Sequence, residues 1–103
     1  MLDKLIEPKF AGEKVVITYD FSSELATGET LSGVITATVE VVAGIDATPS
    51  AMLNGSAQFD ATAKKVLQGI QGGIAGNVYR IKVLSPTTNT NKVLGRSAVI
   101  SIE

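Results

Sequence analysis

The feature that most constrains the fold of this chain is a strict alternation of apolar and charged side chains in one short segment. Tyr79, Ile81 and Val83 alternate with Arg80 and Lys82. Successive side chains of a β-strand point to opposite faces, so this pattern places the apolar residues on one face and the charged residues on the other. We therefore predict a half-buried antiparallel strand that begins at Tyr79 and directs its apolar face at the core.

A glycine-rich segment leads into this strand. Gly69, Gly72, Gly73 and Gly76 superficially suggest a phosphate-binding loop, but such a loop joins a strand to a helix whose N-terminus meets the phosphate. Here the segment leads into a strand, so we interpret these residues as turn glycines. Gly76 stands three residues before Tyr79, as in the corner of immunoglobulin-type sandwiches, where the tyrosine hydroxyl bonds a loop carbonyl.

Other short segments show a similar alternation and are separated by turn residues. The expected strands, besides the one at Tyr79, are Lys14–Asp20, Leu31–Val42, Ala51–Asn54, Ala57–Asp60, Lys65–Ile70 and Arg96–Glu103. Asn54-Gly55 is the strongest short-range turn signal, and Phe21–Leu25 is expected to form one helical turn capped by Asp20 or Ser22. Strands at such regular spacing, with no helical pattern of ten or more residues, are typical of an antiparallel β-sandwich.

Length and composition agree with this class of fold. A chain of 103 residues is expected to form a single domain, 1–103, in which residues 1–13 are a leading arm. Val, Ile, Ala and Leu dominate the apolar residues, whereas there are three Phe, two Tyr and no Trp. Threonine and serine are plentiful as well, and β-branched side chains fit half-buried pleated surfaces. The prediction is an all-β antiparallel sandwich of about seven strands.

The composition argues against most kinds of chemical site. There is no histidine and no cysteine, which removes catalytic triads, thiol chemistry and zinc ligation, so we expect no catalytic, cofactor or metal site. Asp20, Glu24 and Glu29 are the nearest approach to an oxygen-only cation site, but their spacing matches no calcium loop and a solvated acidic rim explains them better. A net charge of −1 argues against a nucleic-acid partner, and the chain has neither a signal-peptide core nor a membrane-spanning run.

The order of short sequence motifs along the chain resembles that in a family of small bacteriophage and prophage proteins. These are proteins of immunoglobulin-like sandwich type, encoded among virion genes. The similarity rests on Pro8-Lys9, Glu13, Tyr19-Asp20-Phe21-Ser22, Leu25, Gly28-Glu29-Thr30-Leu31, Met52-Leu53-Asn54-Gly55, Val66-Leu67-Gln68-Gly69, Gly72-Gly73-Ile74-Ala75-Gly76 and Tyr79. A departure lies at Ser85-Pro86-Thr87-Thr88, where the family has a shorter hairpin turn with glycine. The resemblance implies an immunoglobulin-like sandwich without catalytic residues and a role in the virion or its assembly.

We therefore expect a non-enzymatic structural or accessory protein that contacts other phage structural proteins, in the virion or in the bacterial cytoplasm before assembly. Whether it forms homo-oligomers is left open. The alternative is an immunoglobulin-like binding module that recognises carbohydrate or a cell surface; a small hydrolase is disfavoured by the missing histidine and cysteine. Lys14, Lys92 and Arg96 are expected beside the first and last strands, where charge would limit random edge pairing. The predicted contact sites are an edge strand and the loops Ala43–Ser50 and Ser85–Asn91.

Overall fold

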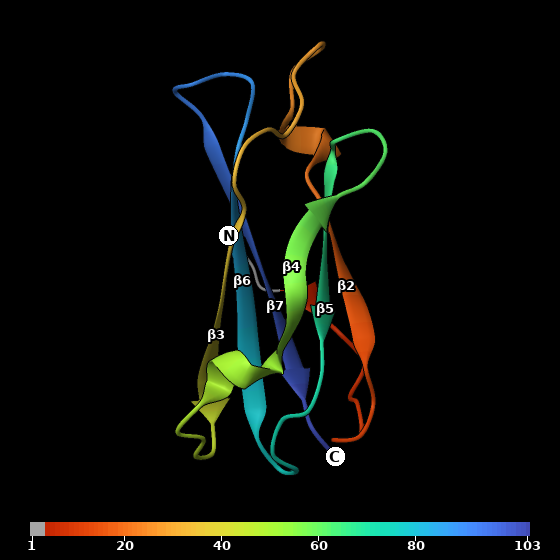
Figure 1. Cartoon of the computed structure of the whole chain (residues 1–103), viewed down its shortest axis with the longest axis vertical. Coiled ribbons are helices and arrows are strands. Elements are labelled where there is room, and N and C mark those ends of the chain that lie inside the picture. Colours follow the sequence, from red (N-terminus) through yellow and green to blue (C-terminus); the bar gives the residue numbers. More distant parts are fainter. Residues whose placement is uncertain (1–3) are drawn as a thin grey trace.

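The computed structural model describes residues 4–103, and in this range the chain forms seven β-strands in two sheets (Figure 1). The strands are β1 (Lys4–Leu5), β2 (Val15–Asp20), β3 (Thr36–Ala43), β4 (Leu53–Phe59), β5 (Lys65–Ile70), β6 (Val78–Pro86) and β7 (Val93–Ser101). Two short 3₁₀ helices, η1 (Ser22–Glu24) and η2 (Pro49–Met52), interrupt the loops. The predicted all-β fold is confirmed.

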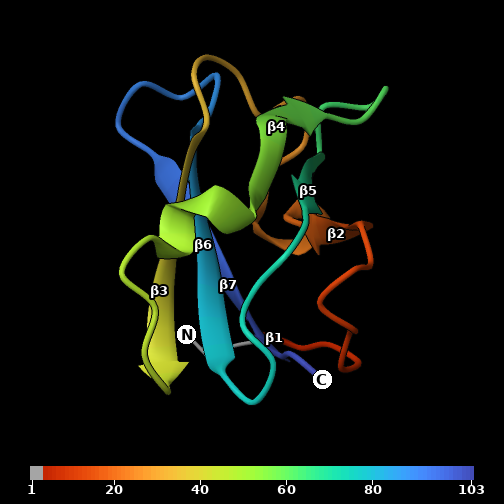
Figure 2. The same cartoon turned by 60° about the horizontal axis from the view of Figure 1, so that its bottom comes forward.

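The two sheets face each other along the long axis of the molecule (Figure 2). One has the strand order β1-β7-β6-β3 and the other β2-β5-β4. This order is compatible with an immunoglobulin-like sandwich, whose strands also divide between two facing sheets. We call the end with the loops 21–35, 60–64 and 87–92 the upper end, and the end with 9–14, 44–52 and 71–77 the lower end, as in Figure 1.

One pair of strands departs from the antiparallel prediction. β1 runs parallel to β7, with Lys4 opposite Ala98 and Leu5 opposite Val99. The chain then descends beside β7 and its C-terminal extension, crosses to the other sheet through residues 9–14, and turns upward as β2. Along this descent, backbone hydrogen bonds join Ile6 N to Val99 O, Lys9 N to Ser101 O, Glu103 N to Lys9 O and Ala11 N to Glu103 O. β1 and β7 are therefore parallel because both run downward in the four-stranded sheet. The chain reverses direction only afterwards, when it crosses to the three-stranded sheet and forms β2.

The core lies between the sheets and follows the predicted period of two. Tyr79, Ile81 and Val83 of β6 are fully buried, as the sequence pattern predicted. The same is true of Ala98, Ile100 and Ile102 at the end of the chain. The sequence of β5 does not by itself decide its buried face, because Val66 and Ile70 share a side with the polar Gln68 while Leu67 lies opposite; the structure buries Val66, Gln68 and Ile70 together. Gly69, predicted as a turn glycine, lies within this strand.

Several predicted strand boundaries are wrong. Asn54-Gly55 is not a hairpin turn, because β4 continues through it with a bulge between Asn54 and Gln58. Gly55 provides the bulge with a positive φ of 77°, and Gln68 Nε2 donates to its carbonyl at 3.2 Å. The hairpin between β4 and β5 lies at residues 60–64, where Asp60 Oδ1 accepts hydrogen bonds from the backbone N–H groups of Lys64 and Lys65.

The other boundary errors concern β3, β6 and β7. β3 begins at Thr36 rather than Leu31, because the backbone of Gly33 (φ 99°) breaks the strand direction before it. Ser85 and Pro86 belong to β6, so the following loop is shorter than predicted, and β7 begins at Val93. The predicted helical turn is present as η1, but the predicted cap is wrong: Phe21 is the N-cap, and no side-chain cap hydrogen bond forms. Asp20 Oδ1 instead accepts from Ser22 N at 2.9 Å, just before the turn.

Candidate functional site

At the lower end, two loops meet around the hydroxyl of Tyr79. This fully buried side chain donates to Asp46 Oδ2 at 2.7 Å and accepts from the backbone N–H of Ile74 at 3.0 Å. The corner arrangement predicted from the sequence is thus present, but its predicted acceptor, a loop carbonyl, is wrong. Asp46 takes that place because its other oxygen accepts from Thr48 N at 2.9 Å, which fixes the carboxylate within its own loop.

Asn77 joins the same two loops a second time. Its Nδ2 donates to the carbonyl of Ile45 at 2.9 Å and to the Tyr79 hydroxyl at 3.3 Å. Gly44 packs against this amide with φ 106°, and a Cβ atom there would overlap Asn77 Oδ1. No larger residue than glycine fits at Gly44 without displacing Asn77. The sequence carries only a weak signal for this network, because glycine and aspartate such as Gly44 and Asp46 are common in any loop.

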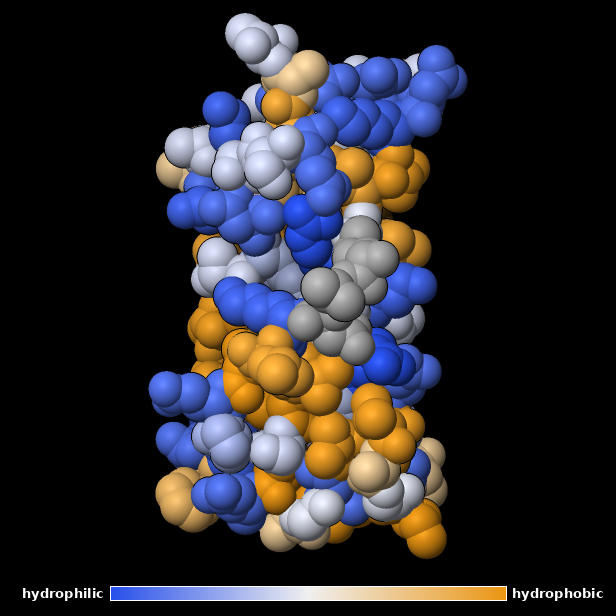
Figure 3. Space-filling view, turned by 180° about the vertical axis from the view of Figure 1, so that it is seen from behind, coloured by the Kyte–Doolittle hydropathy of each residue, from blue (hydrophilic) through white to orange (hydrophobic). Residues whose placement is uncertain are grey.

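These fixed loops display apolar side chains to solvent. Ile45 is 87% exposed and Ile74 is 47% exposed. On the outer face of the four-stranded sheet the apolar character continues, because Leu5 is 81% exposed and pairs with Val99. Figure 3 shows that apolar residues gather on the lower half of this face, whereas its upper half is mostly hydrophilic. We call the exposed residues Leu5, Val42, Ile45 and Ile74, together with the half-buried Val78 and Val99, the lower apolar surface.

At the upper end, ion pairs brace the loops against β7. Lys92 Nζ donates to Glu29 Oε1 at 2.8 Å and to the carbonyl of Glu24 at 2.5 Å. Arg96 pairs with Glu24 Oε1 at 2.5 Å and lies over the ring of Phe21. The pKa of Glu29 is lowered, first by the hydrogen bond from Lys92 and then by the one from the backbone N–H of Ala26.

These contacts correct the predicted role of two basic residues. β7 lies between β1 and β6, so it is not an edge strand, and Lys92 and Arg96 bind internal carboxylates instead of guarding an edge. Lys14 alone of the three stands beside an edge strand, since β2 borders its sheet. The same ion pairs also use Glu24 and Glu29, and in the part of the chain that the structure describes no group of three acidic residues is placed to hold a metal ion.

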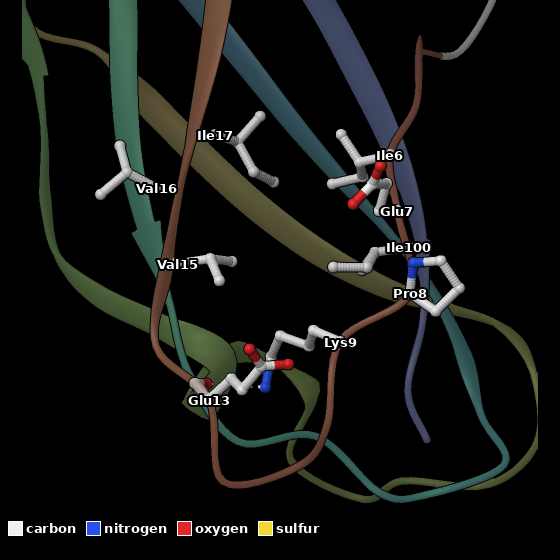
Figure 4. A pocket seen from close by; sticks show the side chains of 9 residues that line it. All are labelled: Ile6, Glu7, Pro8, Lys9, Glu13, Val15, Val16, Ile17 and Ile100. Carbon is white, nitrogen blue, oxygen red and sulfur yellow. Dashed lines mark hydrogen bonds between the residues drawn. The ribbon is translucent and has the colours of Figure 1, made fainter.

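A pocket of 250 Å³ opens on the side of the sandwich between the arm and β2 (Figure 4). Ile6, Val15, Ile17 and Ile100 give it apolar walls, and Lys9 and Glu13 lie at its lower end. Such walls suit an aliphatic side chain better than a polar ligand.

Lys9, which lines this pocket, is a charged residue that is buried. Its burial was not predicted from the sequence. It is 2% exposed, and its Nζ donates to the carbonyls of Phe10 and Glu13 at 2.9 Å each and of Ala11 at 3.4 Å. Burial lowers the pKa of Lys9, while the Glu13 carboxylate acts in the opposite direction. Because three carbonyls occupy its three N–H donors, Lys9 closes the 9–13 loop and is not available to a ligand.

Comparison with known proteins decides between a free-standing binding module and a virion component. The family described as podophage GP4 fiber-tail adaptor protein gp77 matches residues 9–101. The chain belongs to this fiber-tail adaptor family. The resemblance to phage virion proteins noted in the sequence is thereby confirmed, and the family is one of structural adaptor proteins. No match was found among curated proteins or solved structures.

The adaptor-family match covers the loops of both ends and the Tyr79 network, and it begins at Lys9, after β1. Within residues 4–103, no helix has the length and hydropathy needed to cross a membrane.

Proposed function

We propose that this protein is a non-enzymatic adaptor of a phage virion, which connects a tail fibre to the tail through protein–protein contacts. The match of residues 9–101 to the fiber-tail adaptor family is the observation that carries the proposal. The domain acting in this way is residues 1–103, an immunoglobulin-like unit whose arm, residues 1–13, begins outside the described residues. Its partners are other phage structural proteins, with neither nucleic acid nor membrane involved.

An adaptor needs two separate contact surfaces, and the shape of the domain supports this. The molecule measures 42 Å along its long axis and 23 by 22 Å across it. The lower apolar surface lies at one end. Near the other end two more apolar residues are exposed: Val34, in the loop before β3, and Val93 of β7, which pairs with Pro86. We assign one partner to each end.

The lower apolar surface is the better prepared of the two. Apolar side chains exposed together on a small domain are typical of a protein-binding surface. The loops of Ile45 and Ile74 are already held by Tyr79 and Asn77, so little conformational freedom is lost when a partner binds. We expect Ile45 to contribute most, since it is the most exposed residue of this surface.

The proposal is tested on purified particles of the source phage or induced prophage. Mass spectrometry should detect the protein in the particles. Ile45→Asp should lower its incorporation about tenfold or more, since central apolar contacts commonly contribute about 2 kcal/mol or more to binding. Gln58→Asp, an exposed change on β4 in the other sheet, is the matched control and should incorporate normally.

Two results would contradict the proposal. If the expressed protein is absent from particles and from assembly intermediates, it is not a virion adaptor, and the carbohydrate- or cell-surface-binding alternative replaces it. If Ile45→Asp incorporates as well as Gln58→Asp, the lower apolar surface is not a contact site.

A further inference from the structure

The three-stranded sheet has an open edge at β2. Among the described strands β2 pairs with β5, from Val15 opposite Ile70 to Asp20 opposite Lys65. Just beyond the strand, Phe21 N donates to Lys64 O at 3.0 Å, which continues the same register. Backbone bonding alternates along an antiparallel pair, so the odd-numbered residues of β2 bond to β5 and the even-numbered ones point away.

The even-numbered residues therefore present their backbone groups at the edge. Val16, Thr18 and Asp20 direct N–H and C=O away from β5, and Lys4 Nζ accordingly reaches Thr18 O at 3.1 Å from outside the sheet. No strand within residues 4–103 pairs with this edge. Val16 adds an apolar side chain that is 65% exposed on the outer face.

The other sheet edges are short, distorted or covered, whereas β2 is not, although the Lys14 charge beside it limits random pairing. β1 is two residues long, β4 is distorted by its bulge between Asn54 and Gln58, and β3 has a bulge near its end with η2 packed beside it. By contrast, β2 is regular over its six residues and contains neither proline nor a bulge. A regular open edge is a template for pairing with another strand.

The charges that flank β2 identify the strand that fits this edge. In an antiparallel pairing of two copies centred on Ile17, Val16 of one copy lies opposite Thr18 of the other, and their N–H and C=O groups pair once Lys4 Nζ leaves Thr18 O. The same register places Lys14 opposite Asp20 of the second copy, twice, because both are three residues from Ile17. The neighbouring registers, centred on Val16 or Thr18, leave both charges unpaired across the interface.

We propose that this protein forms a two-fold dimer in which β2 pairs antiparallel with β2 of a second copy, centred on Ile17 and closed at both ends by Lys14–Asp20 ion pairs. The two three-stranded sheets become one continuous sheet. Asp20 suits this role, because Oδ1 already accepts from Ser22 N and Oγ, which fixes the carboxylate and leaves Oδ2 for a further donor. The dimer does not depend on the adaptor function, and the lower apolar surface remains uncovered because it lies mainly on the other sheet.

Sedimentation equilibrium of the purified chain over a concentration series tests this dimer. The unchanged protein should show a reversible monomer–dimer equilibrium. Lys14→Glu places two carboxylates opposite each other at both ends and should raise the dimer dissociation constant about tenfold or more. Lys82→Glu makes the same charge change on the exposed face of β6, in the other sheet, and should leave the constant unchanged.

A charge-exchange experiment tests the register itself. Lys14→Glu and Asp20→Lys should each be monomeric where the unchanged protein is dimeric, but an equimolar mixture should form a heterodimer. In that heterodimer the introduced glutamate faces the introduced lysine at one end, while the remaining Lys14 faces the remaining Asp20 at the other. Circular dichroism first establishes that both variants are folded. Should Asp20→Lys not fold, Asp20→Asn, which keeps the acceptor for Ser22, should itself weaken the dimer.

Val16→Pro provides a second route that does not involve charge. It removes an N–H group that points away from β5, so the β2–β5 ladder is retained and the dimer should be lost. The proposal is overturned if the unchanged protein stays monomeric at all concentrations. It is overturned as well if the edge of β2 pairs with a strand of another virion protein and not with a second copy of this chain. It is equally overturned if Lys14→Glu behaves like Lys82→Glu, or if the mixture of charge variants stays monomeric.

Discussion

Replacing Tyr79 by phenylalanine should destabilise the protein more than the loss of one ordinary hydrogen bond. The Tyr79 hydroxyl has three partners: it donates to the Asp46 carboxylate at 2.7 Å and accepts from Ile74 N at 3.0 Å and Asn77 Nδ2 at 3.3 Å. A sequence-based expectation of one carbonyl partner gives about 1 kcal/mol for this substitution. The structure raises that expectation because one partner is charged and another is a backbone N–H in a partly buried turn.

The magnitude follows from these partners. Hydrogen bonds to charged groups contribute about 1.5–3 kcal/mol, and a buried donor left without a partner costs about 1–3 kcal/mol. Since Asp46 keeps Thr48 N and Asn77 keeps the Ile45 carbonyl, the losses are not fully additive. We expect Tyr79→Phe to lower the free energy of unfolding by about 2–3 kcal/mol. Tyr79→Ala should lower it by about 5 kcal/mol, because it also opens a cavity in the core.

Tyr19 provides the matched control. It is as deeply buried as Tyr79, burial raises the pKa of its hydroxyl, and that hydroxyl makes one hydrogen bond, to the carbonyl of Ile81 at 2.8 Å. Tyr19→Phe should therefore lower the free energy of unfolding by about 1 kcal/mol in urea titrations. Hydrogen exchange adds a local readout, because Tyr79→Phe should deprotect the Ile74 amide. Equal losses for the two Tyr→Phe variants, with the Ile74 amide still protected, would refute this account of the corner.

Three further predictions concern the loops and the fold. Gly44→Ala should lower the free energy of unfolding in urea by about 2–4 kcal/mol, whereas Gly28→Ala, which combines φ 84° with open space, should lower it by about 1 kcal/mol; similar losses would contradict the close approach to Asn77. The pKa of Asp60 is lowered to about 2, first by the hydrogen bond from the Thr62 hydroxyl and also by those from the backbone N–H groups of Lys64 and Lys65. The ionised carboxylate therefore stabilises the folded protein fully above its unfolded pKa near 4, and this contribution should be lost as the pH falls toward 2. Melting temperatures measured between pH 6 and 2 should fall less for Asp60→Asn than for the unchanged protein, and parallel curves would exclude this contribution. Far-ultraviolet circular dichroism should be dominated by β-structure, and a helical content above about a quarter would contradict the sandwich.

The strand faces were predictable because a period of two reports directly on burial. Tyr79 and Ile81 of β6, and Ile17 and Tyr19 of β2, all lie inward as their alternation indicated. The same rule explains why β5 was ambiguous, since Gln68 is polar yet lies in the core to bond the bulge at Gly55. Alternation indicates which face a residue occupies, but not which polar residue a bulge requires.

The contacts between distant segments were not predictable from local pattern. Asp46 reaches Tyr79 across 33 positions, and β1 reaches β7 from the opposite end of the chain. Lysine is usually a surface residue, and Lys9 is buried because its own loop directs three backbone carbonyls toward its ammonium group. Such partners depend on how the sheets face each other, so the candidate surfaces at the lower end became visible only with the fold.

The parallel course of the arm beside β7 has a mechanical consequence. The arm enters at the top of this pair and the chain leaves at its bottom, so a force applied to the arm and to the C-terminal end of β7 pulls these two segments in opposite directions. The backbone bonds from Ile6 to Val99, Lys9 to Ser101 and Ala11 to Glu103 then carry the load together, in shear, instead of opening one after another. Buried Lys9 locks the loop that follows. In this member of the fiber-tail adaptor family, the arm and the C-terminal strand are thus joined in the geometry that resists extension between them.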